Sequence, residues 1–365
     1  MKKGFSSLIR FSISFGLLAL LGYLFRQQLD ASLKAVKQAD MRWIMLAAAT
    51  YILFIWISAW RWQILLRAQG LKFTAWYLAR VFTLGLFFCK LLPTSIGGDV
   101  MRIAYTTQPG KTPQAFSATF LDRLIGFQSL AFLAVVMALV VSLNQANTLQ
   151  LGESSLTGFG MLLLLIFILA LLIGVTLVLF NDTCHRLFNR LLALLSNRFP
   201  QLHRLTNLID RSYTSVKSYR RQPLALTISF LSGIGVQASL AITWFLTARA
   251  VRGTVPLGYY LIFIPILNII VNIPTIGGLG VREAAFVLFF TPQWLPNRLT
   301  PEKALSTAVL FLALDLVFAI IGGLFFALLK PNRVVPDGKP SGHCEERSDA
   351  AISRSASKLQ NKGAM

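Results

Sequence analysis

Charged residues are scarce in this sequence of 365 residues, since only 13% are Asp, Glu, Lys or Arg while 55% are hydrophobic. A water-soluble domain of that composition would have to expose large apolar surfaces. The mean hydropathy of +0.64 points the same way. The composition therefore excludes an ordinary soluble protein and indicates an integral membrane protein.

Cysteine is also scarce, and metal-binding and nucleotide-binding patterns are missing. Cys89, Cys184 and Cys344 are too few and too scattered for a disulfide framework. Cys184, His185 and His203 do not have a recognised zinc-ligand spacing. No phosphate-cradling nucleotide motif and no nucleophile elbow occurs. We therefore expect no metal, no cofactor and no direct use of ATP.

Acidic residues are few as well, because 14 of them face 35 basic residues and leave a formal net charge of +21. In a soluble protein this excess would suggest nucleic acid as a partner. In a membrane protein, Lys and Arg concentrate in cytoplasmic loops and attract anionic headgroups. We therefore expect membrane lipids, and no nucleic acid, as partners.

The same charges predict sidedness. The loop 181–222 is rich in arginine, whereas 144–158 has no basic residue, so the first is assigned to the cytoplasm and the second to the outside. Both termini then fall on the cytoplasmic side of a bacterial cytoplasmic membrane. Leucines alternate with arginines in 181–222, as in a helix that lies on the membrane surface.

Long apolar runs predict an all-α, polytopic helical bundle, because each helix satisfies its own backbone hydrogen bonds in lipid. The membrane domain covers 1–330, and the polar tail 331–365 should be disordered. The predicted spans are about 7–25, 43–63, 124–143, 159–180, 223–247 and 304–329.

Two further apolar segments, 74–101 and 257–290, are broken near the middle by a Pro-Thr and Gly-Gly cluster. The loop charges place both ends of the first segment inside and both ends of the second outside. Each segment should therefore form a hairpin. Two half-helices that turn within the membrane and two short crossing helices both fit these lengths.

The two breaks repeat one another in sequence. The first reads LPTSIGGDVMR over 92–102 and the second reads IPTIGGLGVRE over 273–283, and each places an arginine four positions after its second glycine. Similar breaks in segments of opposite orientation indicate an inverted repeat. In transporters of this kind the substrate site lies near the midplane, where broken helices of the two halves meet.

The residues at the breaks suit an anion. Proline ends the first arm, while glycine allows positive φ and close helix approach. Freed N–H groups and an arginine one turn later can hold a phosphate, such as that of a lipid. A purely structural alternative is that the breaks only shape the bundle and that Arg102 and Arg282 are topological charges.

Ionisable residues at membrane depth need partners or a wet cavity. Asp99 and Glu283 could hold the nearby arginines or carry a proton, and Asp315 should pair with an arginine or lysine, in a structural or a working role. Lys90 could instead snorkel to the interface. Asp122 and Arg123 should form a local charged cap at the start of a span. The residues proposed for pairing or charge relay are Lys90, Asp122, Arg123 and Asp315.

Both breaks, together with DRLIG at 122–126, resemble the flippase-like family that includes the transmembrane region of lysylphosphatidylglycerol synthases. The likeness covers roughly 5–330, and GGLGVRE is its most specific element. The resemblance implies movement of a lipid, often with a modified headgroup, between leaflets. The substrate-binding residues that it implies are Gly97, Gly98, Asp99, Arg102, Gly277, Gly278, Gly280, Arg282 and Glu283.

The leading hypothesis is thus a lipid flippase or translocase for an anionic or modified headgroup, and not an enzyme. One alternative is an enzyme of lipid modification that uses a membrane carboxylate as a general base. Another is a membrane subunit that supports a separate lipid-biosynthetic enzyme through the basic loop. The aminoacyl-transferase domain of the full synthases is not found, so lysyl transfer is not implied.

Overall fold

The computed structural model describes residues 37, 39–91, 96–144, 150–151, 156–181, 203–271, 281–293, 295 and 297–329. Within these ranges the regular secondary structure is helical apart from one short antiparallel pair, β1 (Gln150–Leu151) with β2 (Leu156–Thr157). The predicted span 7–25, the tail 331–365 and the glycines Gly277, Gly278 and Gly280 lie outside the described residues.

Among the described residues, five helices are long and apolar enough to cross a membrane. They are α3 (Met41–Ala68), α6 (Thr112–Asn144), α7 (Gly158–Phe180), α10 (Pro223–Ala250) and α13 (Pro301–Leu328). Large apolar side chains on their outer faces are exposed, for example Phe167 at 64% and Leu177 at 66% in α7. Such surfaces are stable only against lipid, so the chain is an integral, multi-pass membrane protein.

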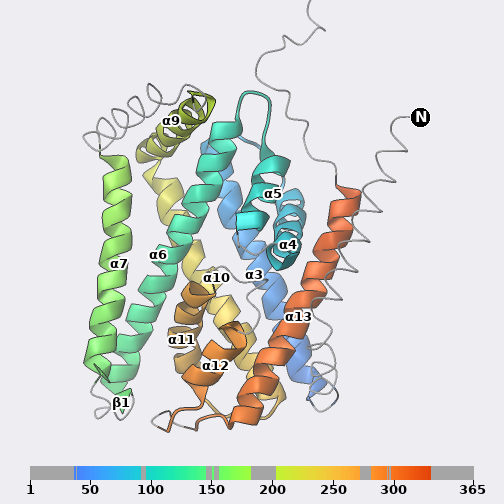
Figure 1. Ribbon diagram of the computed structural model, residues 1–365, viewed down its shortest axis with the longest axis vertical. Helices are drawn as coiled ribbons and strands as arrows, with labels where there is room; N and C mark the ends of the chain where they lie inside the picture. The colour runs from blue at the N-terminus through green and yellow to red at the C-terminus, as the bar shows by residue number, and fades with distance from the viewer. Residues whose placement is uncertain are drawn as a thin grey trace, which may run out of the picture.

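The two broken segments form helical hairpins that enter from opposite faces of the bundle. The first consists of α4 (Ala75–Leu91) and α5 (Ile96–Thr106), and the second of α11 (Leu257–Ile270) and α12 (Val281–Phe290). Figure 1 shows α4 and α5 in the upper half and α11 and α12 in the lower half. The 11 residues of α5 extend only about 16 Å, roughly half of a hydrocarbon core. Arms of this length favour re-entrant hairpins over pairs of crossing helices.

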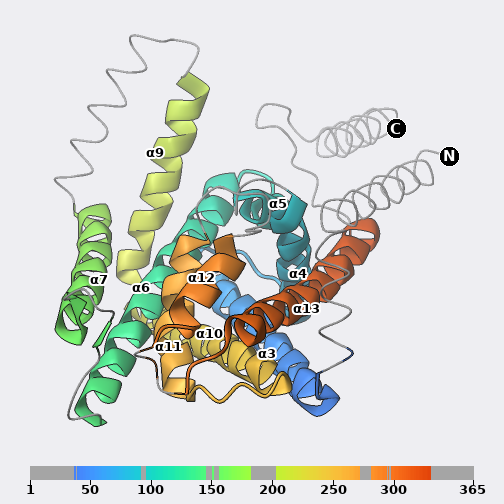
Figure 2. The ribbon, with the colours of Figure 1, turned by 60° about the horizontal axis from the view of Figure 1, so that its bottom comes forward.

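These elements form two repeats of the same order, long helix, two short helices, long helix. The first repeat is α3 to α6 and the second is α10 to α13. Helices α3 and α10 run in opposite directions and pack along each other at the centre (Figures 1 and 2). Each hairpin also packs against the last helix of the other repeat, α4 against α13 and α11 against α6. The hairpins therefore join the two halves.

Close contacts at glycine draw these short helices together. Gly98 in α5 approaches α4 so closely that a β-carbon would lie 2.6 Å from the carbonyl oxygen of Gly85, and Gly322 in α13 meets the backbone of Thr83 in α4. Gly97 and Gly98 are helical rather than in positive φ, which the structure assigns to Gly70 and Gly110. The structure therefore needs glycine at position 98 because α5 approaches α4 closely there, and not because of a turn conformation.

Helix α9 (His203–Ser218) lies in the basic loop, at the upper end of α6 (Figure 1). The short helix η2 (Tyr219–Arg221) follows it. The buried Tyr219 hydroxyl donates to the carbonyl of Leu65 at 2.7 Å, and Gln69 donates to the carbonyl of Ser215 at 3.0 Å. Burial raises the pKa of Tyr219 well above its ordinary value, so this group remains a hydrogen-bond donor that ties η2 to α3, while the Gln69 contact ties α9 to the end of α3.

Candidate functional site

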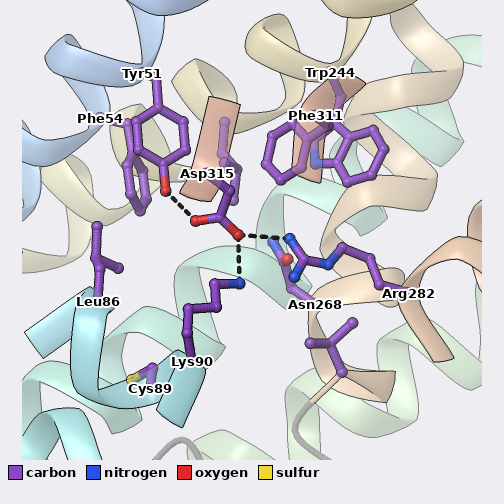
Figure 3. Close-up of a pocket in the computed structure, with 12 residues that line it drawn as sticks. Tyr51, Phe54, Leu86, Cys89, Lys90, Trp244, Asn268, Arg282, Phe311 and Asp315 are labelled. Carbon is purple, nitrogen blue, oxygen red and sulfur yellow. Dashed lines mark hydrogen bonds and ion pairs between the residues drawn. The ribbon is translucent and has the colours of Figure 1, made fainter. Parts of the chain in front are cut away.

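Asp315 in α13 is the centre of a buried charged cluster between the two repeats. One of its carboxylate oxygens accepts a hydrogen bond from the Tyr51 hydroxyl at 2.7 Å. The other oxygen contacts Lys90 Nζ at 2.5 Å and Arg282 Nη1 at 2.7 Å. Figure 3 shows all three groups converging on the one carboxylate. These four residues are buried, with no more than 7% of each exposed, and so are shielded from the surrounding lipid.

The helix breaks explain why these residues meet. Lys90 lies in the last turn of α4, just before the first break, and Arg282 is the second residue of α12, just after the second. Tyr51 and Asp315 come from the middle of the long helices α3 and α13. Because α4 and α12 enter from opposite faces, their inner ends meet near half height of the bundle. The cluster therefore links the tips of both hairpins.

A cavity of about 170 Å³ opens beside this cluster, and both repeats line it. Its polar lining includes Tyr51, Lys90, Asn268, Arg282 and Asp315, and its apolar lining includes Phe54, Leu86, Leu240, Trp244 and Phe311 (Figure 3). The Trp244 and Phe311 rings stack with centroids 3.9 Å apart, and the Arg282 guanidinium lies 5.7 Å from the Phe311 ring. We call this space the central cavity.

The first repeat holds a corresponding cluster around Asp122 in α6. Its two carboxylate oxygens receive Arg61 Nε and Arg102 Nη2, each at 2.8 Å. Asp99 pairs with Arg123 and, at 3.5 Å, with Arg102. Asp122 is only 1% exposed. The cluster therefore joins α3, α5 and α6 in the upper half of the bundle.

Aromatic rings and glycines enclose these arginines. The Arg102 guanidinium lies 4.2 Å from the Trp62 ring centroid and 5.2 Å from that of Phe82, within cation–π distance. The Arg61 guanidinium fills space that β-carbons at Gly126 and Gly233 would crowd, at 3.4 Å and 3.3 Å. Gly126, one turn after Asp122, thus makes room for the cation that Asp122 binds.

The two clusters follow one plan. In each repeat the arginine four positions after the Gly-Gly pair forms an ion pair with an aspartate of the next long helix, Arg102 with Asp122 and Arg282 with Asp315. They differ in surroundings, because Arg282 lines the central cavity and Arg102 does not. The cation that the first repeat contributes to the cavity lining is instead Lys90.

Several predicted roles change with this geometry. Asp122 and Arg123 do not form a local cap, because α6 begins at Thr112 rather than near 124 and both residues pair with other segments. In the sequence, these two charges interrupt the apolar run and so determine where the predicted span begins. In the structure, helix α6 extends past them because the charges are neutralised inside the bundle. Lys90 is buried and paired rather than snorkelling.

Asp99 makes the predicted contact with an arginine, and aspartates more distant in the sequence make closer ones. Asp99 contacts Arg102 only at 3.5 Å, and the close contacts of Arg102 and Arg282 come from Asp122 and Asp315 instead. Glu283 is not among the residues that line the central cavity.

Two residues of these clusters were not predicted, Arg61 and Tyr51. Arg61 could have been singled out from the sequence, because it is an arginine between two tryptophans in a predicted span and a charge at that depth needs a partner. Tyr51 has no such signal, since tyrosine is common in membrane helices, and only its contact with Asp315 reveals it.

The family comparison agrees with this architecture. The family model described as the lysylphosphatidylglycerol synthase TM region matches residues 7–323, which include the first repeat and all of the second except the end of α13. A comparison with curated proteins finds no significant match. The family relationship indicates a membrane protein of lipid modification or translocation. The chain belongs to the family of the lysylphosphatidylglycerol synthase transmembrane region.

Proposed function

We propose that this protein is a transporter that moves a phospholipid between leaflets and binds the headgroup phosphate in the central cavity. The observation that carries the proposal is the pair of cations that line this cavity. Lys90 and Arg282 share the single carboxylate of Asp315, and both side chains line the cavity. Two cations that meet at one cavity at membrane depth favour an anionic ligand such as a phosphate.

The two cations suit a phosphate in different ways. A guanidinium binds phosphate oxygens with two parallel hydrogen bonds, whereas an ammonium acts as a compact point charge. Arg282 uses Nη1 for Asp315. Lys90 has three donors, of which Asp315 engages one. Both side chains can therefore keep Asp315 while they bind a headgroup.

The size and lining of the cavity favour a headgroup over a whole lipid. A volume of about 170 Å³ is below that of pockets that enclose drug-sized ligands. Phe54, Leu86 and Leu240 present apolar surface beside the charges, which suits the glycerol region. The acyl chains would remain in the bilayer.

The repeat architecture supplies a means of movement. Rocking of one repeat against the other would expose a site between them to each side in turn. Lys90 belongs to one repeat and Arg282 and Asp315 to the other, so such a motion would change the contacts around the phosphate. By the loop charges, the face with α9 is cytoplasmic in our proposal.

A role as the membrane subunit of a lipid-modifying enzyme is a second candidate. Arg211, Arg220 and Arg221 are exposed on α9 and η2, where an acidic partner surface could bind. In that case the exchange of lipid would require the partner.

Leaflet exchange of headgroup-labelled lipids in liposomes tests the proposal. The native protein should accelerate exchange of phosphatidylglycerol over protein-free liposomes, and a phosphate-free diacylglycerol glycolipid should exchange more slowly. Arg282→Gln should reduce the rate, whereas Arg67→Gln, a change at an exposed arginine outside both clusters, should not. If purified protein moves no lipid, or moves both lipids equally, the proposal fails and the subunit hypothesis gains.

A further inference from the structure

We propose that a groove between α3, α4 and α13 binds an anionic phospholipid of the surrounding leaflet, at a site separate from the central cavity. The groove holds a space of about 120 Å³. Six of its lining residues carry the argument, Ile52, Trp56, Trp76, Arg80, Phe318 and Phe325. We call it the outer groove.

Arg80 supplies the positive charge of the outer groove. Its Nε is buried and has no hydrogen-bond partner among the described residues. Among the residues that the structure describes, no carboxylate lies within ion-pair distance of the Arg80 guanidinium. Its guanidinium lies 5.6 Å from the Trp76 ring centroid, within cation–π distance. A cation in an apolar groove without a carboxylate partner favours a phosphate ligand.

Two tryptophans indicate the depth of this charge. The Trp56 and Trp76 rings stack with centroids 5.7 Å apart and are 38% and 55% exposed. Exposed tryptophan in membrane proteins concentrates at the headgroup level. Trp76 is the second residue of α4, close to the face where this hairpin enters. Arg80, one turn further, is therefore placed to reach a lipid phosphate.

The other end of the outer groove suits an acyl chain. Ile52 lies one turn from Trp56 on the side away from the face where α4 enters, and Phe318 lies about two turns from Phe325 along α13 in the same direction. Apolar walls leading away from one cation match the shape of a phospholipid, with a charged head and a long tail. A free phosphate would leave these walls unused.

An aromatic pair separates the outer groove from the central cavity. The Phe318 ring stacks on Tyr51 with centroids 4.7 Å apart and an interplanar angle of 24°. Tyr51 lines the central cavity, and Phe318 lines the outer groove. Lipid binding in the outer groove therefore requires neither translocation nor the Asp315 cluster.

Photo-cross-linking of the full chain in nanodiscs tests this site. The probe is phosphatidylglycerol with a diazirine in one acyl chain, and the labelled peptides are mapped by mass spectrometry. We expect labelling of the α13 segment around Phe318 to Phe325, with stronger competition from unlabelled phosphatidylglycerol than from phosphatidylcholine. Arg80→Gln should lower this labelling about tenfold, the loss expected when a charged hydrogen bond is removed, and Arg80→Lys should retain most of it.

Two further variants separate charge from fold and from transport. Arg67→Gln removes an exposed arginine outside the groove and should leave labelling unchanged. Ile321→Trp should block the groove without changing charge, since Ile321 also lines it. Equal labelling of all lipid-facing helices, equal competition by both lipids, or full labelling of Arg80→Gln would overturn the proposal. If labelling persists in Arg282→Gln protein, lipid binding in the outer groove does not depend on the central cavity, and it is then supported even if the proposed translocation is wrong.

Discussion

Asp315 presents one negative charge to two cations and a phenol, and its removal should be the most damaging single change in the central cavity. Asp315→Asn would leave Lys90 and Arg282 side by side and buried without the carboxylate that they share. We expect a loss of roughly 3–5 kcal/mol in stability, as for other broken buried ion pairs. The midpoint of thermal unfolding in detergent measures it.

Lys90→Met is the matched comparison. It removes one cation but leaves Asp315 paired with Arg282 and hydrogen-bonded to Tyr51. We therefore expect a clearly smaller fall in the unfolding midpoint than for Asp315→Asn. Equal midpoints for the two variants would mean that Asp315 does not balance both cations.

At the scale of the residue, the sequence predicts charged groups well and their partners poorly. Depth in an apolar span singles out Lys90 and Asp315, because a charge there must be compensated. It does not say which cation meets which carboxylate. Arg102 and Asp122 are 20 positions apart and Arg282 and Asp315 are 33 apart, so only the packing of separate helices determines these pairs.

At the scale of the element, the contact between α4 and α13 should depend on a single glycine. A β-carbon at Gly322 would collide with the backbone carbonyl of Thr83, so Gly322→Ala must push the two helices apart. We expect a loss of about 1–3 kcal/mol, the usual effect of overpacking, seen as a lower unfolding midpoint.

Gly174→Ala in α7 is the control for this prediction. No atom lies within 4 Å of a β-carbon built there, so the better helix propensity of alanine should leave stability unchanged or raise it by up to about 1 kcal/mol. If both alanine variants behaved alike, the close approach of α4 and α13 would not matter for stability.

The re-entrant hairpins make a separate prediction about accessibility. In a chain without its native cysteines, Lys72→Cys and Pro109→Cys flank the first hairpin, while Thr254→Cys and Arg298→Cys flank the second; all four positions are exposed. A membrane-impermeant maleimide added to sealed, oriented vesicles should label one pair from the outside and the other pair only after the membrane is opened. Labelling of Lys72→Cys and Pro109→Cys from different sides would mean that the first segment crosses the membrane.

Element positions could be predicted from apolar length and from the Pro-Thr and Gly-Gly breaks. The start of α6 could not be predicted, because the charges of Asp122 and Arg123 mark the limit of an apolar span in the sequence. In the structure, ion pairs allow Asp122 to be buried and Arg123 to be partly buried within the helix. The choice between re-entrant and crossing hairpins also required the structure. Segment lengths allowed both, whereas the helices α5 and α12 have only 11 and 10 residues.

At the scale of the whole molecule, the inverted repeat was predictable because two similar motifs lie in segments of opposite orientation. The difference between the charged clusters of the two halves could not be predicted from the sequence. Asp122 is enclosed by Arg61 and Arg102 under aromatic rings, whereas Asp315 borders an open cavity. In our account the first cluster maintains the structure and the second binds the lipid phosphate.

The most direct test removes all the charge of the central cavity at once. Lys90→Met, Arg282→Met and Asp315→Leu together replace the ion pairs by apolar groups of similar size, a change that is often neutral or stabilising. The account predicts a triple variant that unfolds near the native temperature but no longer accelerates phosphatidylglycerol exchange in liposomes, while Arg67→Gln protein exchanges lipid at the native rate. Native exchange rates in the folded triple variant would contradict it.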